Sequence, residues 1–516
     1  MARRPEGRGD SVPVKDNRSK RPAERRGPPR DRDARGRDSR DSDESLVKVI
    51  PDRWSARGEA EVQGEGRVML VWQGIPGEKT VARIEHDGQN QVLSRWLRSP
   101  EPDPHRVEPA CAKYAACGGC PLMHLDVEGQ DDARRSLVRR SLDEAGLGDV
   151  QIGDFHRSPA GQAGFRHVVK LGFGVSDMGH LRVGAWGRND RRVVPIPDCV
   201  VAAPVLARTM SSLAHLVIDM DLRPYDARTG AGLLRSAVLR ASHTTGEVLV
   251  TLVAGRPDRA LGELAERLCQ METSIVGVWL HLNDTEGNAI FERDERGTVG
   301  VRALAGKDHI EETLGGITYR VGPGDFFQTN PSVAETLYAR VIERCGLAQD
   351  IPFVDLYCGV GGLALPAAKV TGWALGIEEI EGAVLRAREA AVRNEVPAEF
   401  VVDRVQDVLE DLSKRLVKRR PVVAVDPARR GLEPGVADGV ISLDPRRIAY
   451  ISCNPVAMAR DLAEFRAKGF TIGEVELFDM FPNTPHVEAL VVLEGRQGEA
   501  RGGTPKRRVA RGPTAA

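Results

Sequence analysis

From about residue 336 onward, apolar strands and amphipathic helices alternate along the chain, a rhythm that few folds accommodate. Short apolar runs typical of buried strands lie at residues 353–357, 373–377, 399–402, 422–425, 448–452, 475–478 and 487–493. Helical patterns at residues 363–369, 382–394, 405–416 and 457–468 separate most of them. The alternation predicts an α/β fold with an open, doubly wound parallel sheet, covered by helices on both faces, that binds ligands at the carboxyl ends of its strands.

The chain before this region has a different pattern. Residues 47–109 contain short β-type runs separated by Gly and Pro, which predicts a small β-barrel. A helix is predicted at residues 131–145. From residue 165 to about 313 most segments are strand-like, with one helix near 260–269, which predicts a mixed α+β domain.

Basic charge is concentrated at the two ends of the 516-residue chain. Residues 1–40 hold 14 Lys and Arg against 7 Asp and Glu, and residues 496–516 hold 6 against 1. Such segments cannot bury a core, so we expect two disordered tails that either contact nucleic acid or only solubilise the chain. No run approaches the roughly 18 apolar residues of a membrane span, and the charged start lacks the apolar core of a signal peptide. We therefore expect a soluble, cytoplasmic protein with no membrane contact.

A glycine-rich turn follows the first strand of the alternating region, in Phe353-Val-Asp-Leu-Tyr-Cys-Gly-Val-Gly-Gly362. Glycine lets the backbone approach a ligand closely, and the N-terminus of the following helix favours polar or anionic groups. Glu378 ends the next strand, where a carboxylate can bind both hydroxyls of a ribose. These residues alone fit either a nicotinamide cofactor or S-adenosylmethionine, since Gly359-Val-Gly-Gly-Leu-Ala364 also satisfies the weak dinucleotide pattern.

Motifs further along the chain separate these two alternatives. In Ile448-Ala-Tyr-Ile-Ser-Cys-Asn-Pro455, an apolar strand delivers Cys453 to its carboxyl end, before an Asn-Pro turn and a helix. A lone cysteine near a strand is commonly an inert packing residue, but this position displays a thiol over the expected ligand crevice. The polar loop between the last two strands brings Glu488 towards the same edge.

A nucleophilic Cys, a carboxylate and a methyl donor together indicate methylation of uracil at C5. The C5 carbon of uracil is too weakly nucleophilic to take a methyl group directly. A thiolate that adds at C6 creates an enolate, whose C5 attacks the sulfonium methyl group; a base then removes the C5 proton and the thiol leaves by elimination. In this interpretation Cys453 is the nucleophile and Glu488 is the base.

Over residues 47–493 the sequence resembles the RNA uracil-5-methyltransferases, specifically the bacterial type that makes 5-methyluridine in 23S ribosomal RNA and carries an iron-sulfur cluster. Five motifs in family order carry the resemblance: Asp325-Phe-Phe-Gln-Thr-Asn-Pro331, Asp355-Leu-Tyr-Cys-Gly-Val-Gly361, Asp426-Pro-Ala-Arg429, Ser452-Cys-Asn-Pro455 and Phe481-Pro-Asn-Thr-Pro-His-Val-Glu488. Five ordered motifs are far more specific than any one of them.

The resemblance implies S-adenosylmethionine as the methyl donor and gives each matching residue a role. Cys453 and Glu488 keep their catalytic roles, and Asp426 is implied to lie near both the donor and the target base. The residues implied to bind the donor are Gln328, Tyr357, Glu378 and Asp426. Ala428 stands where the family usually has a proline, and Gly362 where some members have an asparagine; these departures affect loop shape and remove no reacting group.

Three of the eight cysteines fall within ten residues, in Cys111-x5-Cys117-Gly-Gly-Cys120, and Cys199 could supply a fourth ligand from further along the chain. On spacing alone, four thiolates suit zinc or a [4Fe-4S] cluster equally well. The resemblance implies the cluster, since family members carry the same Cys-Gly-Gly-Cys loop and a distant fourth cysteine. We expect a structural clip or a platform for RNA, without redox chemistry.

The predicted barrel resembles a TRAM domain, with Gly74-Ile-Pro-Gly-Glu78 as the matching segment. Barrels of the oligonucleotide-binding type hold RNA with aromatic and basic residues on one face. Residues that either contact RNA or serve as ordinary core and surface are Trp72, Lys79, Arg83, Arg95 and Trp96, together with Arg166 and Lys170 in a strand that resembles the family's basic strand.

These inferences predict a basic tail (1–45), a TRAM barrel (46–108), an iron-sulfur loop with a helix (109–155), a central RNA-binding α+β domain (156–313), a class I methyltransferase domain (314–495) and a second basic tail (496–516). We predict a monomer that methylates C5 of a uridine in 23S rRNA, with transfer RNA as the closest alternative substrate. A nicotinamide-dependent oxidoreductase would leave Cys453, Glu488 and Gln328 without a joint role. The intact Cys and Glu argue against an inactive RNA-binding protein.

Overall fold

A computed structural model describes residues 45–495, apart from residues 65, 189–191 and 296. Except for Ser45, the two predicted basic tails lie outside the described residues. The chain divides into two units, and all elements below belong to the second, Leu46–Ala516. Among the described residues, no helix has the length and apolar character needed to cross a membrane.

The alternating region, together with β7, forms an eight-stranded sheet in the order β19-β18-β17-β20-β21-β23-β22-β7. Its strands are β7 (Ile152–His156), β17 (Phe353–Leu356), β18 (Ala374–Glu378), β19 (Ala398–Val402), β20 (Val422–Val425), β21 (Arg447–Ser452), β22 (Thr471–Phe478) and β23 (Glu488–Glu494). Strands β17 to β21 run parallel, in agreement with the predicted sheet, whereas β23 is antiparallel to β21 and β22. The sequence did not indicate β7, which lies at the boundary predicted between residues 155 and 156 and pairs in parallel with β22.

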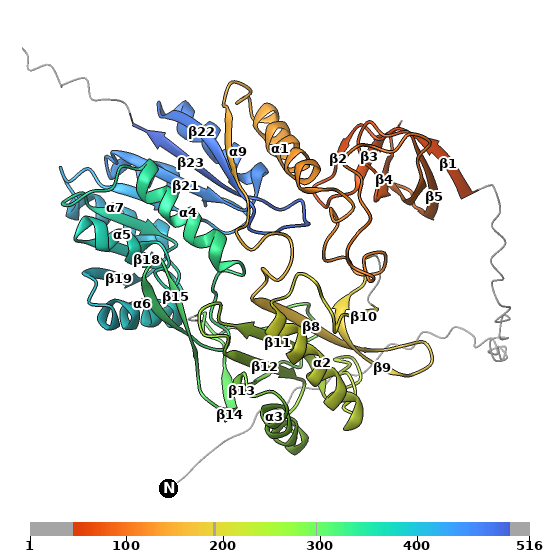
Figure 1. Ribbon diagram of the computed structural model, residues 1–516. Coiled ribbons are helices and arrows are strands. Elements are labelled where there is room, and N and C mark those ends of the chain that lie inside the picture. Colours follow the sequence, from red (N-terminus) through yellow and green to blue (C-terminus); the bar gives the residue numbers. More distant parts are fainter. Residues whose placement is uncertain (1–44, 65, 189–191, 296, 496–516) are drawn as a thin grey trace, which may run out of the picture. The chain divides into compact units, whose positions relative to one another are not determined.

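Alternate residues of each parallel strand enter separate cores on the two faces of the sheet. Phe353 of β17 lies in the core that includes α4 (Pro331–Arg344), α5 (Ala364–Thr371) and α6 (Glu381–Arg393). Val354 lies in the opposite core, with α1 (Val127–Glu144), α7 (Val405–Arg415), α8 (Val436–Ser442) and α9 (Pro455–Ala467). Helix α1 comes from the predicted iron-sulfur segment, yet it packs beside α9 of this sheet (Figure 1).

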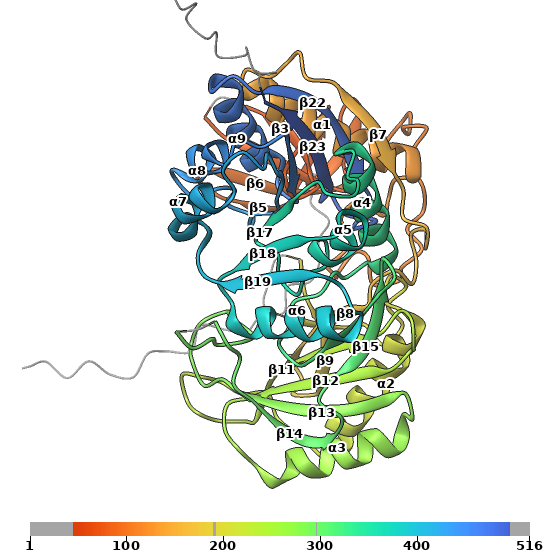
Figure 2. The ribbon, with the colours of Figure 1, turned by 90° about the vertical axis from the view of Figure 1, so that its left-hand side faces the viewer.

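The middle of the chain forms a seven-stranded sheet in the order β10-β9-β8-β11-β12-β13-β14, with α2 (Pro204–Asp219) and α3 (Arg259–Met271) packed against it (Figure 2). Its strands are β8 (Val168–Val175), β9 (Leu181–Trp186), β10 (Val193–Pro195), β11 (Leu234–Ala241), β12 (Val248–Ala254), β13 (Ile275–Leu282) and β14 (Val301–Gly306). The prediction of a single helix here misses α2, although its buried Leu206, Met210, Leu213 and Val217 follow helical spacing. A hairpin of β15 (Ile310–Leu314) and β16 (Ile317–Val321) spans the boundary predicted between residues 313 and 314.

Six short strands form the amino-terminal sheet, in the order β1-β5-β6-β4-β3-β2. They are β1 (Leu46–Val49), β2 (Arg53–Trp54), β3 (Ala60–Gln63), β4 (Val68–Trp72), β5 (Thr80–Asp87) and β6 (Gln91–Arg98). The region is β-rich, as expected, while its TRAM identity stays a prediction. Trp54 and Ile75 form a small core with Leu122, Ala133 and Leu137, which joins this sheet to the cysteine loop and to α1.

Candidate active site

The turn after β17 is shaped by backbone conformations that most side chains disfavour. Tyr357, Gly359 and Gly361 have positive φ angles of 71°, 54° and 82°. A side chain at Gly361 would also place its Cβ 3.0 Å from the Phe400 ring. The Tyr357 amide donates to the Ile377 carbonyl at 3.0 Å, which ties the turn to the end of β18. The glycines therefore let this loop fold tightly against the neighbouring strand.

Glu378 ends β18 beside this turn. Its carboxylate accepts hydrogen bonds from the amides of Gly359, at 3.1 Å, and Ile380, at 2.9 Å. Burial raises the pKa of Glu378 even though these two bonds act in the opposite direction. A Cβ at Gly362 would lie 3.0 Å from the Tyr338 hydroxyl. This close approach is a physical reason for glycine at a position where some family members have an asparagine.

One cavity of about 880 Å³ lies at the carboxyl ends of the parallel strands. All six residues predicted to bind the donor or to catalyse line it, namely Gln328, Tyr357, Glu378, Asp426, Cys453 and Glu488. Cavities of this size hold ligands as large as nucleotides. The structure therefore brings the predicted site residues to one place, although they come from widely separated parts of the chain.

Cys453 directly follows β21 and is half-buried at the cavity. The turn behind it is fixed by Asn454, whose side chain accepts from the Val456 amide at 3.1 Å and donates to the Arg429 carbonyl at 2.7 Å. Burial raises the pKa of Cys453 to about 11, and the charges of Glu488 and Asp426 add to the rise, while Arg429 opposes it. The thiol is thus well placed but not ionised near neutral pH in the free protein.

Glu488 begins β23, where it is only 7% exposed, and Asp426 directly follows β20. Asp426 keeps part of its surface open to the cavity, yet the surrounding protein is dense enough that burial raises its pKa to about 6. Burial and the neighbouring charge of Asp426 raise the pKa of Glu488 well above its usual range, and Arg429 opposes this shift. Two carboxyl groups that interact so closely do not ionise independently, so they titrate as a pair.

Tyr338 and Arg429 are among the residues of this cavity that sequence reasoning did not single out. The Tyr338 hydroxyl accepts a hydrogen bond from Gln328 Nε2 at 3.5 Å, and burial raises the Tyr338 pKa. Tyr338 lies in α4 at ordinary helical spacing, so no local signal marks it. Arg429 ends the Asp426 motif, where it could have been found as a cation that follows a carboxylate predicted to bind the donor.

The four cysteines predicted to bind a metal also come together. Cys111, Cys117, Cys120 and Cys199 line a second, small cavity of about 30 Å³. Burial raises the pKa of Cys120 to about 12, and the three neighbouring thiols add to that rise. Within the part of the chain that the structure describes, however, no group of three or more His, Cys, Asp or Glu side chains is arranged to hold a metal ion. The four cysteines therefore share a cavity, and a metal centre there stays a prediction.

The residues predicted to contact RNA occupy different environments. Trp72 is buried and stacks on Tyr114 with 5.6 Å between ring centroids, while the Arg188 guanidinium lies 4.6 Å from its ring. Trp72 is therefore a packing residue and not an RNA contact. The remaining candidates are exposed or half-buried, and they are Lys79, Arg83, Arg95, Trp96, Arg166 and Lys170.

Comparison with known proteins gives this fold and site a family. The family model described as tRNA (Uracil-5-)-methyltransferase matches residues 298–496. A Gloeobacter violaceus protein, named as an uncharacterized RNA methyltransferase, is 31% identical over 83% of this chain and 92% of its own length. A protein of Caldanaerobacter subterraneus with the same designation is 30% identical over 84% of this chain and 95% of its own length.

A solved structure extends this likeness to three dimensions. The tRNA (uracil-54, C5)-methyltransferase of Pyrococcus abyssi, in complex with S-adenosyl-L-homocysteine, matches with a TM-score of 0.67 and 25% identity. The match covers 87% of this chain and 100% of that chain. Fold and site together define an S-adenosylmethionine-dependent methyltransferase. The chain belongs to the RNA (uracil-5-)-methyltransferase family, which decides against the nicotinamide-dependent alternative.

Proposed function

We propose that this protein methylates C5 of a uridine in 23S rRNA through a covalent adduct between Cys453 and C6 of the base. The observation that carries the proposal is the single cavity at the strand ends, which a thiol, two carboxyl groups and the predicted donor-binding residues all line. The 23S rRNA substrate is favoured by the resemblance to bacterial enzymes that share the cysteine loop.

The reaction begins at the Cys453 thiolate, which adds to C6 of a uracil flipped out of its RNA. The Sγ–C6 bond forms, and the electron pair of the C5–C6 double bond passes into an enolate. C5 then bonds to the sulfonium methyl carbon, and the carbon–sulfur bond to the donor breaks. Glu488 takes the C5 proton, the Sγ–C6 bond breaks, and the Cys453 thiolate is regenerated.

Gln328, Tyr357, Glu378 and Asp426 would hold the donor, S-adenosylmethionine, which supplies an electrophilic methyl group. The Glu378 carboxylate suits a ribose because two main-chain amides fix its orientation at the cavity. The Tyr357 hydroxyl donates to Glu433 Oε2 at 2.8 Å, which holds the aromatic ring in place beside the glycine loop.

Transfer RNA is the second candidate substrate. The matching family model names tRNA, and the Pyrococcus abyssi neighbour is a tRNA (uracil-54, C5)-methyltransferase. In either case the amino-terminal sheet, β1 to β6, would act as a TRAM domain that binds RNA together with Arg166 and Lys170.

A [4Fe-4S] cluster is proposed on Cys111, Cys117, Cys120 and Cys199. Support comes from the one small cavity that all four residues line and from the preference of such clusters for thiolate ligands. The cluster would cross-link the cysteine loop to the segment that carries Cys199. No step of methyl transfer is assigned to the cluster. Iron and sulfide analysis of anaerobically purified protein tests this proposal, and equal iron in native protein and Cys199→Ser would contradict it.

Methyl transfer from labelled S-adenosylmethionine to separate 23S rRNA and tRNA transcripts tests the function. We expect label as 5-methyluridine in rRNA, and none with Cys453→Ala. Label only in tRNA would retain the chemistry and replace the substrate. Label in neither RNA, under conditions in which the donor binds, would contradict the proposal.

A further inference from the structure

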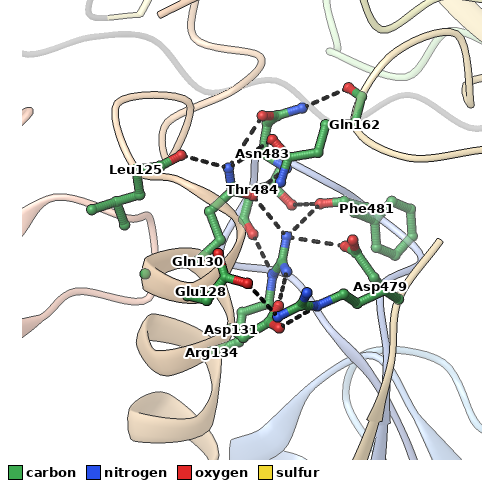
Figure 3. A network of polar contacts seen from close by, with 12 residues as sticks. Leu125, Glu128, Gln130, Asp131, Arg134, Gln162, Asp479, Phe481, Asn483 and Thr484 are labelled. Atoms are coloured by element: carbon green, nitrogen blue, oxygen red, sulfur yellow. Dashed lines mark hydrogen bonds and ion pairs between the residues drawn. The ribbon is translucent and has the colours of Figure 1, made fainter. Parts of the chain in front are cut away.

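We call residues 479–487, between β22 and β23, the base loop, because they lead directly into Glu488, the proposed base. Side chains of α1, which is distant in the sequence, hold this loop (Figure 3). The Arg134 guanidinium on α1 donates to the carbonyls of Thr484, at 2.9 Å, and Phe481, at 3.4 Å. It also pairs with Asp479 at 3.1 Å. One side chain therefore contacts the beginning, the middle and the later part of the base loop.

Gln130 lies one turn earlier on α1 and contacts the same loop. It accepts from the Asn483 amide at 2.9 Å and donates to Asn483 Oδ1 at 3.3 Å (Figure 3). The Asn483 side chain donates to the Gln162 carbonyl at 2.9 Å, and the Leu122 amide donates to the Asn483 carbonyl at 2.9 Å. Asn483 has a φ angle of 65°, a left-handed conformation that asparagine tolerates. The turn of the base loop is thus specified by partners outside it.

These contacts are buried. Arg134 and Gln130 are both 0% exposed. Burial of the guanidinium lowers the Arg134 pKa, and the charges of Asp479 and Asp131 only oppose that effect. A buried ion pair with such a desolvation cost contributes little net stability, whereas its fixed geometry can specify one conformation. The bond from Arg134 also satisfies the Thr484 carbonyl, whereas the Phe481 carbonyl additionally accepts from the Thr484 amide at 3.2 Å and hydroxyl at 2.7 Å.

We propose that Arg134 and Gln130 are positioning residues, which hold the base loop so that the Glu488 carboxylate meets the C5 proton. The inference rests on the proposed function, because it assigns the step that depends on Glu488. Phe481 links the two sites directly, since its carbonyl accepts from Arg134 and the residue lines the catalytic cavity. The sheet holds Glu488 from one side, since Glu488 pairs with Phe478 of β22 and Ala489 pairs with Ser452 of β21, next to Cys453. The base loop holds Glu488 from the other side, so a shift of this loop changes the orientation of its carboxylate towards Cys453.

The test compares Arg134→Met and Gln130→Met with Arg139→Met in the full-length protein. Arg139 is a matched control because it lies on the same helix and donates to the carbonyls of Val150, at 2.8 Å, and Leu147, at 3.2 Å, away from the base loop. Turnover is measured on RNA with uridine and with 5-deuterated uridine. Adduct formation is measured on RNA with 5-fluorouridine, whose fluorine cannot be removed as a proton, so this step does not need Glu488.

In Arg134→Met and Gln130→Met we expect kcat to fall by about 10- to 100-fold, with KM for RNA within about threefold of native, as misplaced catalytic groups produce. A deuterium isotope effect on kcat should appear, because proton removal becomes limiting, while the rate of adduct formation with 5-fluorouridine RNA stays native. Arg134→Lys should recover part of the turnover, and Arg139→Met should behave as native.

Equal losses of adduct formation and turnover would overturn the proposal, since they indicate general structural damage. Native kcat in both folded variants would overturn it as well. If Arg134→Met does not fold, the same measurements of turnover and adduct formation on Gln130→Met test the proposal. Failure of the proposed function itself is recognised separately, because the native protein would then produce neither 5-methyluridine nor an adduct.

Discussion

Cys453 lies beside two carboxyl groups that oppose its ionisation, although the proposed reaction needs its thiolate. Burial, Glu488 and Asp426 together raise its pKa to about 11, and Arg429 offsets only part of that rise. Below this pKa, the thiolate fraction increases about tenfold for each pH unit. Adduct formation should therefore accelerate as the pH rises through the alkaline range.

Glu488→Gln is expected to lower the Cys453 pKa, because the substitution removes a charge that raises it. The measurement is the pH dependence of Cys453 alkylation by iodoacetamide, followed by mass spectrometry of the Cys453 peptide. The midpoint in the variant should lie below the native value of about 11. An unchanged or higher midpoint would mean that the two side chains do not interact as the geometry indicates.

Asp426→Asn is expected to stabilise the folded protein at alkaline pH. The folded-state pKa of Asp426 is raised to about 6 from a usual value of 3.8, so ionisation above pH 6 disfavours folding, whereas well below pH 3.8 the group is protonated in both states. Urea unfolding should show a gain on the order of 2 kcal/mol at pH 8 and almost none at about pH 3. A loss of stability at pH 8 would contradict this account.

At the scale of single elements, the local sequence pattern determines most of the catalytic sheet. Strand β20 lies at the predicted residues 422–425, and the helices predicted at 382–394 and 405–416 are found within one residue at each end. The weakly alternating residues of β7 give no such signal, because this strand depends on pairing with the distant β22. Helix α8 is also missed; it is a short helix that begins after Gly435, which has a φ angle of 85°.

Gly361→Ala tests the tight turn after β17. Its φ of 82° strains any side chain, and the added Cβ would lie 3.0 Å from Phe400 and 3.2 Å from Leu365. We expect a loss of about 1–3 kcal/mol in the free energy of unfolding and weaker binding of S-adenosylhomocysteine. Gly262→Ala, in the first turn of α3 with open space around its Cβ, is the control and should gain about 0.5–1 kcal/mol. Equal effects at the two positions would contradict the assigned role of the turn.

At the scale of the whole chain, elements from different predicted segments share one sheet and one core. Strand β7 and helix α1 precede the central sheet in sequence but complete the catalytic one. The His167 amide in the central segment donates to the Thr329 carbonyl at 2.8 Å, and Leu122 after the cysteine loop is bonded to Asn483. Composition and motif order indicate which segments exist. Contacts between segments that are distant in the sequence depend on tertiary packing, which a sequence pattern does not encode.

A fragment of residues 314–495 is therefore expected not to unfold cooperatively. It lacks β7, and it exposes the core that Val138 and Leu142 of α1 cover, both of which are 0% exposed. A fragment of residues 109–495 retains these elements and should keep a cooperative transition in urea, followed by circular dichroism. A cooperative transition in the shorter fragment would show that the predicted methyltransferase segment is self-sufficient.

The residues of the candidate site also differ in whether the sequence indicates them. Its six predicted residues lie at strand ends or in motif loops; strand and turn patterns indicated Glu378, Cys453 and Glu488, and the family resemblance implied Gln328, Tyr357 and Asp426. Tyr338, Gln130 and Arg134 lie on helices, where a buried polar residue carries no local sign of the loop that it contacts. The cysteine pattern indicated which four thiols would share a cavity, but spacing did not determine how closely they converge.

The central claim is that Cys453 attacks the base and Glu488 completes the reaction, and covalent trapping tests it most directly. Glu488→Gln is incubated with S-adenosylmethionine and 23S rRNA, denatured, and digested for mass spectrometry. The account predicts a denaturation-resistant protein–RNA complex, in which a methylated uridine is attached to Cys453, and no such complex when Cys453→Ala is added to the variant. An absence of any complex, or a complex that persists without Cys453, would contradict it.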